Sequence, residues 1–261
     1  MDQFKHIKVS IEAGLARIVI DRPENANALD LTSTSELHRA ALLCDASPEV
    51  RAVLLTGTGP TFCVGGDLKA FNGYDGNLKA YIKAAADAIH NALAVLRRMD
   101  APLVVAVNGT AAGAGFSLAM AGDLVLAARS ARFTVSFTAA GLVPDSGATF
   151  HLPRLVGLRR AQELIFTNRL LSADEALEWG VINQVVDDAV LINQAEFMAR
   201  QLADGPTHAY GAAKRLLLDS YGHSLEHQLG LEARGVAAAA DHPEGREGIA
   251  AFSVKRKPNF R

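Results

Sequence analysis

Residues 102–147 hold the pattern most suggestive of chemistry. The apolar run 102–107 predicts a buried strand, and the glycine-rich run 108–115 leads from it into a short helix. Glycines at such a junction let backbone N–H groups come close to a ligand. Further along, Asp145 lies in the turn-forming sequence 144–147, before another helix. Exposed N–H donors and one carboxylate in an apolar setting predict a site that stabilises an oxyanion and moves a proton.

Asp145 also has a purely structural interpretation. The sequence Pro-Asp-Ser-Gly is common in turns, and Asp is a favourable N-cap residue for a following helix. From the local residues alone, both interpretations stay open.

Hydrophobic patterns predict the elements that must position these residues. Segments 7–12 and 15–20 alternate apolar and polar residues on either side of a short turn, which predicts a hairpin. Continuous apolar runs predict strands that are buried on both faces, at 52–56, 103–107 and 124–127. Between the first two of these runs, apolar residues recur at helical spacing over 78–96.

After Asp145 the pattern becomes mostly helical. The sequence Ser172-Ala-Asp-Glu175 is a capping box for a helix that ends before Gly180, and 181–186 predicts a late strand. Three further helical patterns begin near Asp188, Pro206 and Ser224. Alternating strands and helices followed by helices alone predict an α/β core with a helical C-terminal region.

Composition narrows the class of protein. The 261 residues are 49% hydrophobic and carry a formal net charge of -2, so a large core is expected and nucleic acid is not an expected partner. Cys44 and Cys63 fit neither a disulfide framework nor a metal-ligand spacing. No signal-peptide pattern or membrane-length apolar run is present in the sequence. A soluble protein of a reducing compartment, the cytoplasm, is expected.

Several motifs in order resemble the crotonase (enoyl-CoA hydratase/isomerase) superfamily over nearly the whole chain. They lie at residues 21–29, 62–68, 108–123, 142–157 and 251–260. The resemblance implies a spiral of β-β-α turns over 1–190 and a helical trimerisation region over 191–261, with trimers that often pair into hexamers. It also implies an acyl-CoA thioester substrate, whose enolate oxygen is held by the backbone N–H groups of Gly66 and Ala114.

The sequence departs from the family's hydratases at two positions. Those enzymes carry glutamates where this chain has Ser117 and Phe137, so hydration by the usual two-carboxylate route is not expected. Asp145 matches the catalytic base of several isomerases in the superfamily. The local sequence is most similar to the phenylacetate-pathway epoxide (oxepin-CoA-forming) isomerases, except at Ala148, where a second glycine is usual.

His90 suggests an alternative to the isomerase reaction. The superfamily's 4-chlorobenzoyl-CoA dehalogenases carry a histidine at this place and an aspartate like Asp145, which attacks the aromatic ring. They have a tryptophan at the position of Phe137. A histidine on the flank of the long helix without a chemical role is the other interpretation.

The remaining candidates concern binding of CoA and of the acyl group. Arg22 is either near the CoA or a surface arginine. Family positions near the CoA or the thioester are Ala26, Val64, Gly65, Asp67, Leu68, Gly113 and Phe137. Lys255, Arg256 and Lys257 either reach CoA phosphates, from the same or a neighbouring subunit, or form a solvated basic tail. Phe71, Tyr74 and Tyr81 either line the acyl cavity or only pack.

These observations predict an acyl-CoA isomerase in which Asp145 shuttles a proton. Neither a metal nor a redox cofactor is expected, because CoA is part of the substrate. Three alternatives remain: hydration by a non-standard route, dehalogenase-like chemistry with Asp145 and His90, and an acyl-CoA binding or scaffolding protein without catalysis.

Overall fold

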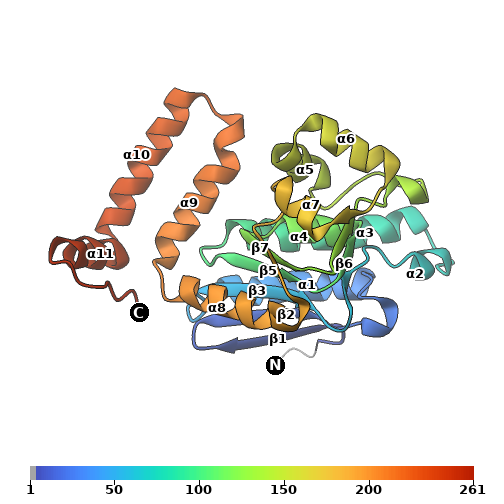
Figure 1. The fold of residues 1–261 in the computed structure, drawn as a ribbon, viewed down its shortest axis with the longest axis horizontal. Helices are drawn as coiled ribbons and strands as arrows, with labels where there is room; N and C mark the ends of the chain where they lie inside the picture. The colour runs from blue at the N-terminus through green and yellow to red at the C-terminus, as the bar shows by residue number, and fades with distance from the viewer. Residues whose placement is uncertain (1–3) are drawn as a thin grey trace.

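A computed structural model describes residues 4–261 and shows two β-sheets surrounded by helices (Figure 1). The larger sheet has the strand order β1-β2-β3-β5-β7-β10. Its strands are β1 (Ile7–Glu12), β2 (Leu15–Ile20), β3 (Ala52–Gly57), β5 (Leu103–Val107), β7 (Leu124–Ala128) and β10 (Gln184–Val186). Strands β1 and β2 form the predicted antiparallel hairpin, and the other neighbours pair in parallel. The predicted buried strands are confirmed.

The smaller sheet has the order β4-β6-β8-β9. Its strands are β4 (Thr61–Cys63), β6 (Thr110–Ala112), β8 (Arg132–Thr134) and β9 (Leu171–Ser172). Strands β4, β6 and β8 each follow a strand of the larger sheet along the chain, and each is followed by a helix. This repeat confirms the predicted spiral of β-β-α turns.

Helices connect and cover the two sheets. They are α1 (Leu31–Ala46), α2 (Leu68–Asn72), α3 (Leu78–Arg98), α4 (Ala114–Met120), α5 (Ala148–Val156), α6 (Leu158–Thr167) and α7 (Ala173–Glu178). Short 3₁₀ turns occupy Pro23–Asn25, Thr138–Ala140, Asp188–Val190 and Ser220–Gly222. The capping box of α7 is formed as predicted by Ser172 and Glu175. The late strand begins only at Gln184, because the N–H groups of Val181 and Ile182 donate to the Ala176 carbonyl of α7.

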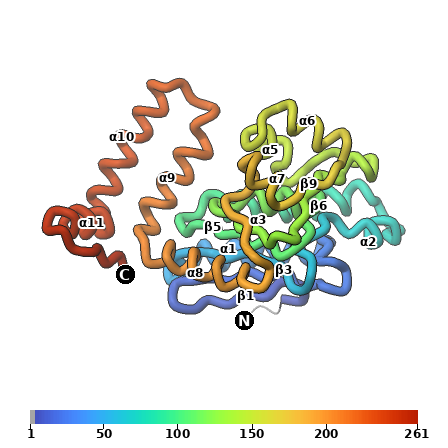
Figure 2. Tube along the Cα trace, in the orientation of Figure 1, coloured from blue at the N-terminus to red at the C-terminus, as the bar shows by residue number. Residues whose placement is uncertain are grey.

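The C-terminal helices divide into two groups. Helix α8 (Leu191–Ala203) packs on β3 and β5, and its buried positions are Leu191, Ala195, Ala199 and Ala203. Helix α8 thus packs on the larger sheet, although it follows residue 190. Helices α9 (Thr207–Asp219), α10 (Leu225–Asp241) and α11 (Pro243–Ser253) stand out from that body (Figures 1 and 2). None of the helices in residues 4–261 combines the length and apolar character needed to cross a membrane.

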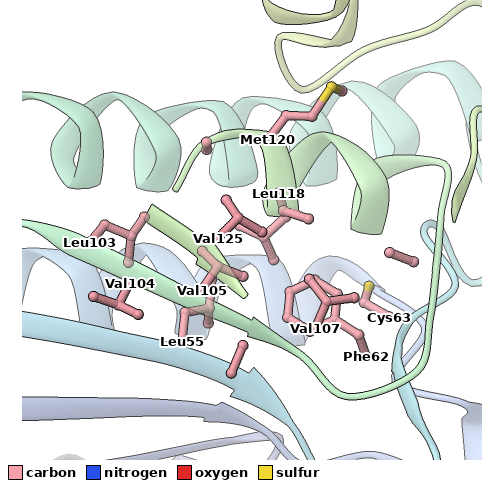
Figure 3. Packing of buried hydrophobic residues seen from close by; sticks show 14 of the residues in the cluster. Leu55, Phe62, Cys63, Leu103, Val104, Val105, Val107, Leu118, Met120 and Val125 are labelled. Carbon is pink, nitrogen blue, oxygen red and sulfur yellow. The ribbon is translucent and has the colours of Figure 1, made fainter. Parts of the chain in front are cut away.

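The core between the sheets supports the segment that follows β6. Figure 3 shows Val105 and Val107 of β5 packed between Leu55 of β3 and Leu118 of α4. Phe62 and Cys63 of β4 lie beside Val107 in the same layer and are fully buried (Figure 3). Because this layer is dense, the beginning of α4 has a defined position relative to the end of β4.

Candidate active site

Two parallel strands of the smaller sheet bring the predicted oxyanion donors together. Strands β4 and β6 are hydrogen-bonded neighbours, so the segments that follow them leave the sheet side by side. Their approach requires glycine: a Cβ added to Gly115 would lie 2.0 Å from the Cys63 carbonyl oxygen. A Cβ on Gly65, which has φ +91°, would lie 3.0 Å from the backbone nitrogen of Ala114. The glycine spacing in the sequence thus reflects contact between two backbones.

The N–H groups of Gly66 and Ala114 are available to a ligand. Within residues 4–261 neither group donates a hydrogen bond to the protein, whereas the adjacent Asp67 N–H donates to the Leu29 carbonyl. Ala114 is the first residue of α4, where a helix leaves its N–H groups unpaired. Both residues line the same cavity, so two donors face one space.

That cavity has a volume of about 330 Å³ and an apolar lining. Helix α3 contributes one wall with Ile82, Ala85, Ala86 and Ile89. The opposite side is formed by Phe137, Ala140, Leu142 and Val143, and Phe71, Leu68 and Val64 complete it. The sequence had identified the apolar stripe of α3 as a helix pattern without assigning it to the site. Phe71 lines the cavity, whereas Tyr74 and Tyr81 pack on each other at 4.4 Å between ring centroids.

Asp145 supplies the one ionisable side chain among the described residues that line this cavity. Its side chain is 32% exposed, and its Oδ1 accepts a hydrogen bond from Ser146 Oγ at 3.0 Å. Burial raises the pKa of Asp145, while the Ser146 hydroxyl and the nearby His90 act in the opposite direction. A carboxylate with a raised pKa is suited to accepting a proton and giving it back.

The structural interpretation of Asp145 as a helix cap is wrong. Helix α5 begins at Ala148 and its N-cap is Gly147, with no side-chain cap hydrogen bond. Ser146 and Gly147 both have positive φ, +52° and +81°, and these two residues make the turn that presents Asp145. Ala148, where relatives usually have glycine, adopts ordinary helical backbone and is buried.

Ser117 and Phe137 occupy the two positions where hydratases of the family carry glutamates. Ser117 is 0% exposed, and its Oγ donates to the backbone carbonyls of Asp145 at 3.1 Å and Gly113 at 3.3 Å. It therefore ties the Asp145 turn to the beginning of α4. Phe137 lines the cavity and packs against the core. Neither side chain can act as an acid or base.

His90 contacts the turn rather than the cavity. Its Nε2 accepts a hydrogen bond from the Ser146 N–H at 3.1 Å and lies 3.8 Å from Asp145 Oδ2. Because a backbone N–H can only donate, Nε2 is the acceptor in this hydrogen bond. Ser146 was missed by the sequence analysis, although its place next to Asp145 in the turn was a signal.

Arg22 is 5% exposed, so the interpretation as a surface arginine is wrong. Its Nη2 lies 3.1 Å from Asp67 Oδ2 and 3.2 Å from Asp30 Oδ2. Asp67 Oδ1 in turn accepts the Ala70 N–H and caps α2. These contacts join the loop after β2 to the segment that carries Gly66.

The other predicted CoA positions divide into two groups. Val64 and Leu68 line the cavity, and the Val64 N–H donates to the Ala26 carbonyl at 3.3 Å. Gly113 lines the cavity beside Ala114. Lys255 and Lys257 follow α11, which Figure 1 places at the opposite end of the molecule from α2. Within a single chain they do not join the site.

Comparison with known proteins identifies the family of this chain. The enoyl-CoA hydratase/isomerase family profile matches residues 10–261, and the chain belongs to that family. It is 38% identical to 1,2-epoxyphenylacetyl-CoA isomerase of Escherichia coli, over 96% of each chain. It is 35% identical to 4-chlorobenzoyl coenzyme A dehalogenase-2 of Arthrobacter sp., over 96% of this chain and 91% of that protein.

Solved structures show the same crotonase fold. A structure of an enoyl-CoA hydratase from Polaromonas sp. superposes with a TM-score of 0.93 at 33% identity, covering 98% of this chain and 99% of that one. The names of these three relatives all contain a CoA compound, yet the reactions that they name differ: isomerisation, dehalogenation and hydration. The family is established by these matches, and the reaction has to be argued from the site.

Proposed function

We propose that this enzyme is an acyl-CoA isomerase that works through a thioester enolate. One observation carries the proposal: Asp145 is the one ionisable side chain on the described cavity wall, which also presents the free N–H groups of Gly66 and Ala114. Hydration needs an acid and a base for addition of water, whereas one carboxylate suffices for moving a proton within a substrate.

The residues would have the following roles in the reaction. The thioester oxygen accepts hydrogen bonds from the Gly66 and Ala114 N–H groups, each worth about 3 kcal/mol of transition-state stabilisation. The Asp145 carboxylate removes a proton from the α- or γ-carbon, which forms the enolate. The resulting carboxylic acid returns the proton to a different carbon, or assists opening of an epoxide on a ring. The apolar wall keeps water from the enolate.

Similarity to the Escherichia coli 1,2-epoxyphenylacetyl-CoA isomerase supports an isomerase. On the same basis, we propose a phenylacetate-derived acyl group as one candidate substrate. CoA would bind as part of the substrate, with no separate cofactor. The three C-terminal helices that stand out from the body would bind neighbouring subunits in a trimer or a pair of trimers.

The test is Asp145→Asn, assayed with 3-enoyl-, dienoyl-, 2-enoyl- and aromatic CoA thioesters. Asparagine keeps the size of the side chain but removes the base, so isomerisation should fall by about 10²–10⁴-fold. Binding of the thioester should change little. Asp187→Asn is the control, because Asp187 is an exposed aspartate whose one ion-pair partner within residues 4–261 is Arg129. Near-normal isomerisation by Asp145→Asn, or efficient crotonyl-CoA hydration by the unmodified enzyme, would contradict the proposal.

A second candidate is aromatic acyl-CoA dehalogenation with Asp145 as nucleophile. The 3.8 Å separation between His90 Nε2 and Asp145 Oδ2 favours it, since a histidine so close could activate water to release an aspartyl ester. Chloride release from 4-chlorobenzoyl-CoA would identify this activity. The Ser146 N–H bond to the same nitrogen favours the isomerase instead.

A further inference from the structure

A second cavity lies behind the turn that presents Asp145. It has a volume of about 250 Å³, and α3 and the Asp145 turn separate it from the acyl cavity. On α3, Ile89 lines the acyl cavity and the next residue, His90, lines the second one. In the turn, Asp145 lines the acyl cavity and Ser146 lines the second one. Adjacent residues therefore face two different spaces across one thin wall.

Ser146 joins the two sides of that wall. Its Oγ donates to Asp145 Oδ1 at 3.0 Å, and its N–H donates to His90 Nε2 at 3.1 Å. A serine hydroxyl both donates and accepts, so it can receive one proton while it releases another. Ser146 is 1% exposed, so only a small part of its surface is open to the second cavity that it lines.

The second cavity can hold water. His90 and His151 line the cavity, and within residues 4–261 the His151 ring makes no hydrogen bond to the protein. Burial, with the nearby Arg97 and Arg154, lowers the pKa of His151 to about 4, so the ring is neutral near pH 7. The cavity opens to the surface, because the lining residues Ala94 and Phe150 are exposed. Polar partners and sufficient room are the conditions for bound water.

We infer that the second cavity exchanges protons between solvent and Asp145 through the Ser146 hydroxyl, while the acyl cavity is occupied by substrate. The inference rests on the proposed role of Asp145 as proton shuttle. Protonated Asp145 passes its proton to Ser146 Oγ, and Ser146 releases its own proton to a cavity water. The hydronium formed gives that proton to bulk solvent. The same steps in reverse return a proton, and no other bond changes.

Isomerisation in D₂O tests the route. The product of the unmodified enzyme should contain deuterium, because the proton held by Asp145 exchanges before it is returned. Ala94→Phe adds a ring at the exposed opening of the second cavity without touching the acyl cavity. It should lower the deuterium content of the product by about threefold or more and change turnover by no more than about twofold. Ser146→Ala should lower the deuterium content as well.

Ala84→Phe is the matched control, because Ala84 is an exposed alanine of the same helix that lines neither cavity. It should leave the deuterium content unchanged. Equal deuterium content in the unmodified enzyme, Ala94→Phe and Ser146→Ala would overturn the inference, as would a product without any deuterium. An unmodified enzyme that isomerises none of the thioesters would instead reject the proposed function.

A crystal structure gives a readout that does not depend on activity. Ordered waters should fill the second cavity, with one within hydrogen-bond distance of Ser146 Oγ. A cavity without ordered water at Ser146 would overturn the inference, whatever reaction the enzyme catalyses.

Discussion

The Oγ of Ser117 donates a hydrogen bond to the backbone carbonyl of Asp145, with 3.1 Å between the two oxygens. This bond connects α4, whose first residue is the proposed oxyanion donor Ala114, to the turn that holds the Asp145 carboxylate. We therefore expect Ser117, at the position where hydratases of the family carry a glutamate, to position the Asp145 turn. In the proposed reaction, the distance between the thioester oxygen and Asp145 would depend on this connection.

Ser117→Ala tests that role. Loss of one buried hydrogen bond should lower the free energy of unfolding by about 1 kcal/mol, because the Asp145 carbonyl loses a partner. Turnover should fall by about three- to tenfold, with a smaller change in KM, since the carboxylate becomes less well placed. Chemical denaturation and steady-state kinetics provide the two measurements. Ser10→Ala, at an exposed serine of β1, is the control. Unchanged kinetics in Ser117→Ala would show that the bond is not needed for positioning.

Asp145→Asn should make the folded protein more stable at neutral pH. The folded state raises the pKa of Asp145, so the charged form is less favourable in the folded than in the unfolded chain. The penalty is absent below the unfolded pKa and grows as pH rises through the raised folded pKa. The stability gain of Asp145→Asn should therefore develop between the unfolded and the folded pKa of Asp145 and persist at higher pH. Thermal unfolding measured from acid to neutral pH checks this, and a constant difference at all pH values would contradict it.

The raised pKa also sets the acid limb of the activity profile. The base must be ionised, so kcat/KM should decline as pH falls through the pKa of Asp145, at a higher pH than an ordinary aspartate would give. A rate profile with the best isomerase substrate measures this. An inflection at or below the ordinary aspartate range would mean that the carboxylate is not desolvated in the free enzyme.

His90→Ala separates the two candidate reactions. An isomerase loses only the acceptor for the Ser146 N–H, so isomerisation should fall by less than about tenfold. A reaction through an aspartyl ester needs the histidine for hydrolysis, so it should stall and leave the ester on Asp145. Mass spectrometry of the protein after incubation with an aromatic CoA thioester detects such an ester. Its accumulation would favour the dehalogenase-like reaction.

Gly115→Ala should damage the oxyanion site. The new Cβ would lie 2.0 Å from the Cys63 carbonyl oxygen, so α4 and the end of β4 must move apart. Overpacking of this kind costs about 1–3 kcal/mol, and both activity and the thermal midpoint should fall. Gly222→Ala is the control, since a Cβ there meets nothing within 4 Å. Full activity in Gly115→Ala would show that the two donor segments do not need this close approach.

Local patterns in the sequence determined most of the elements. The alternation over 7–20, the apolar runs of β3, β5 and β7, and the capping box of α7 each led to the observed strand or helix. Such signals depend on neighbouring residues, so they can be read without knowledge of distant contacts. The absence of glutamate at Ser117 and Phe137 was equally visible, and it already weighed against two-carboxylate hydration.

Only the tertiary structure decided how the site is assembled. The burial of Arg22 between Asp30 and Asp67 arises from segments far apart in the chain, so no local pattern indicated it. The Ser117–Asp145 and His90–Ser146 hydrogen bonds join residues 28 and 56 positions apart. A turn sequence such as 144–147 suits both a helix cap and a catalytic aspartate. The fold excludes the helix cap, because Gly147 is the N-cap residue of α5 and Asp145 lines the apolar cavity instead.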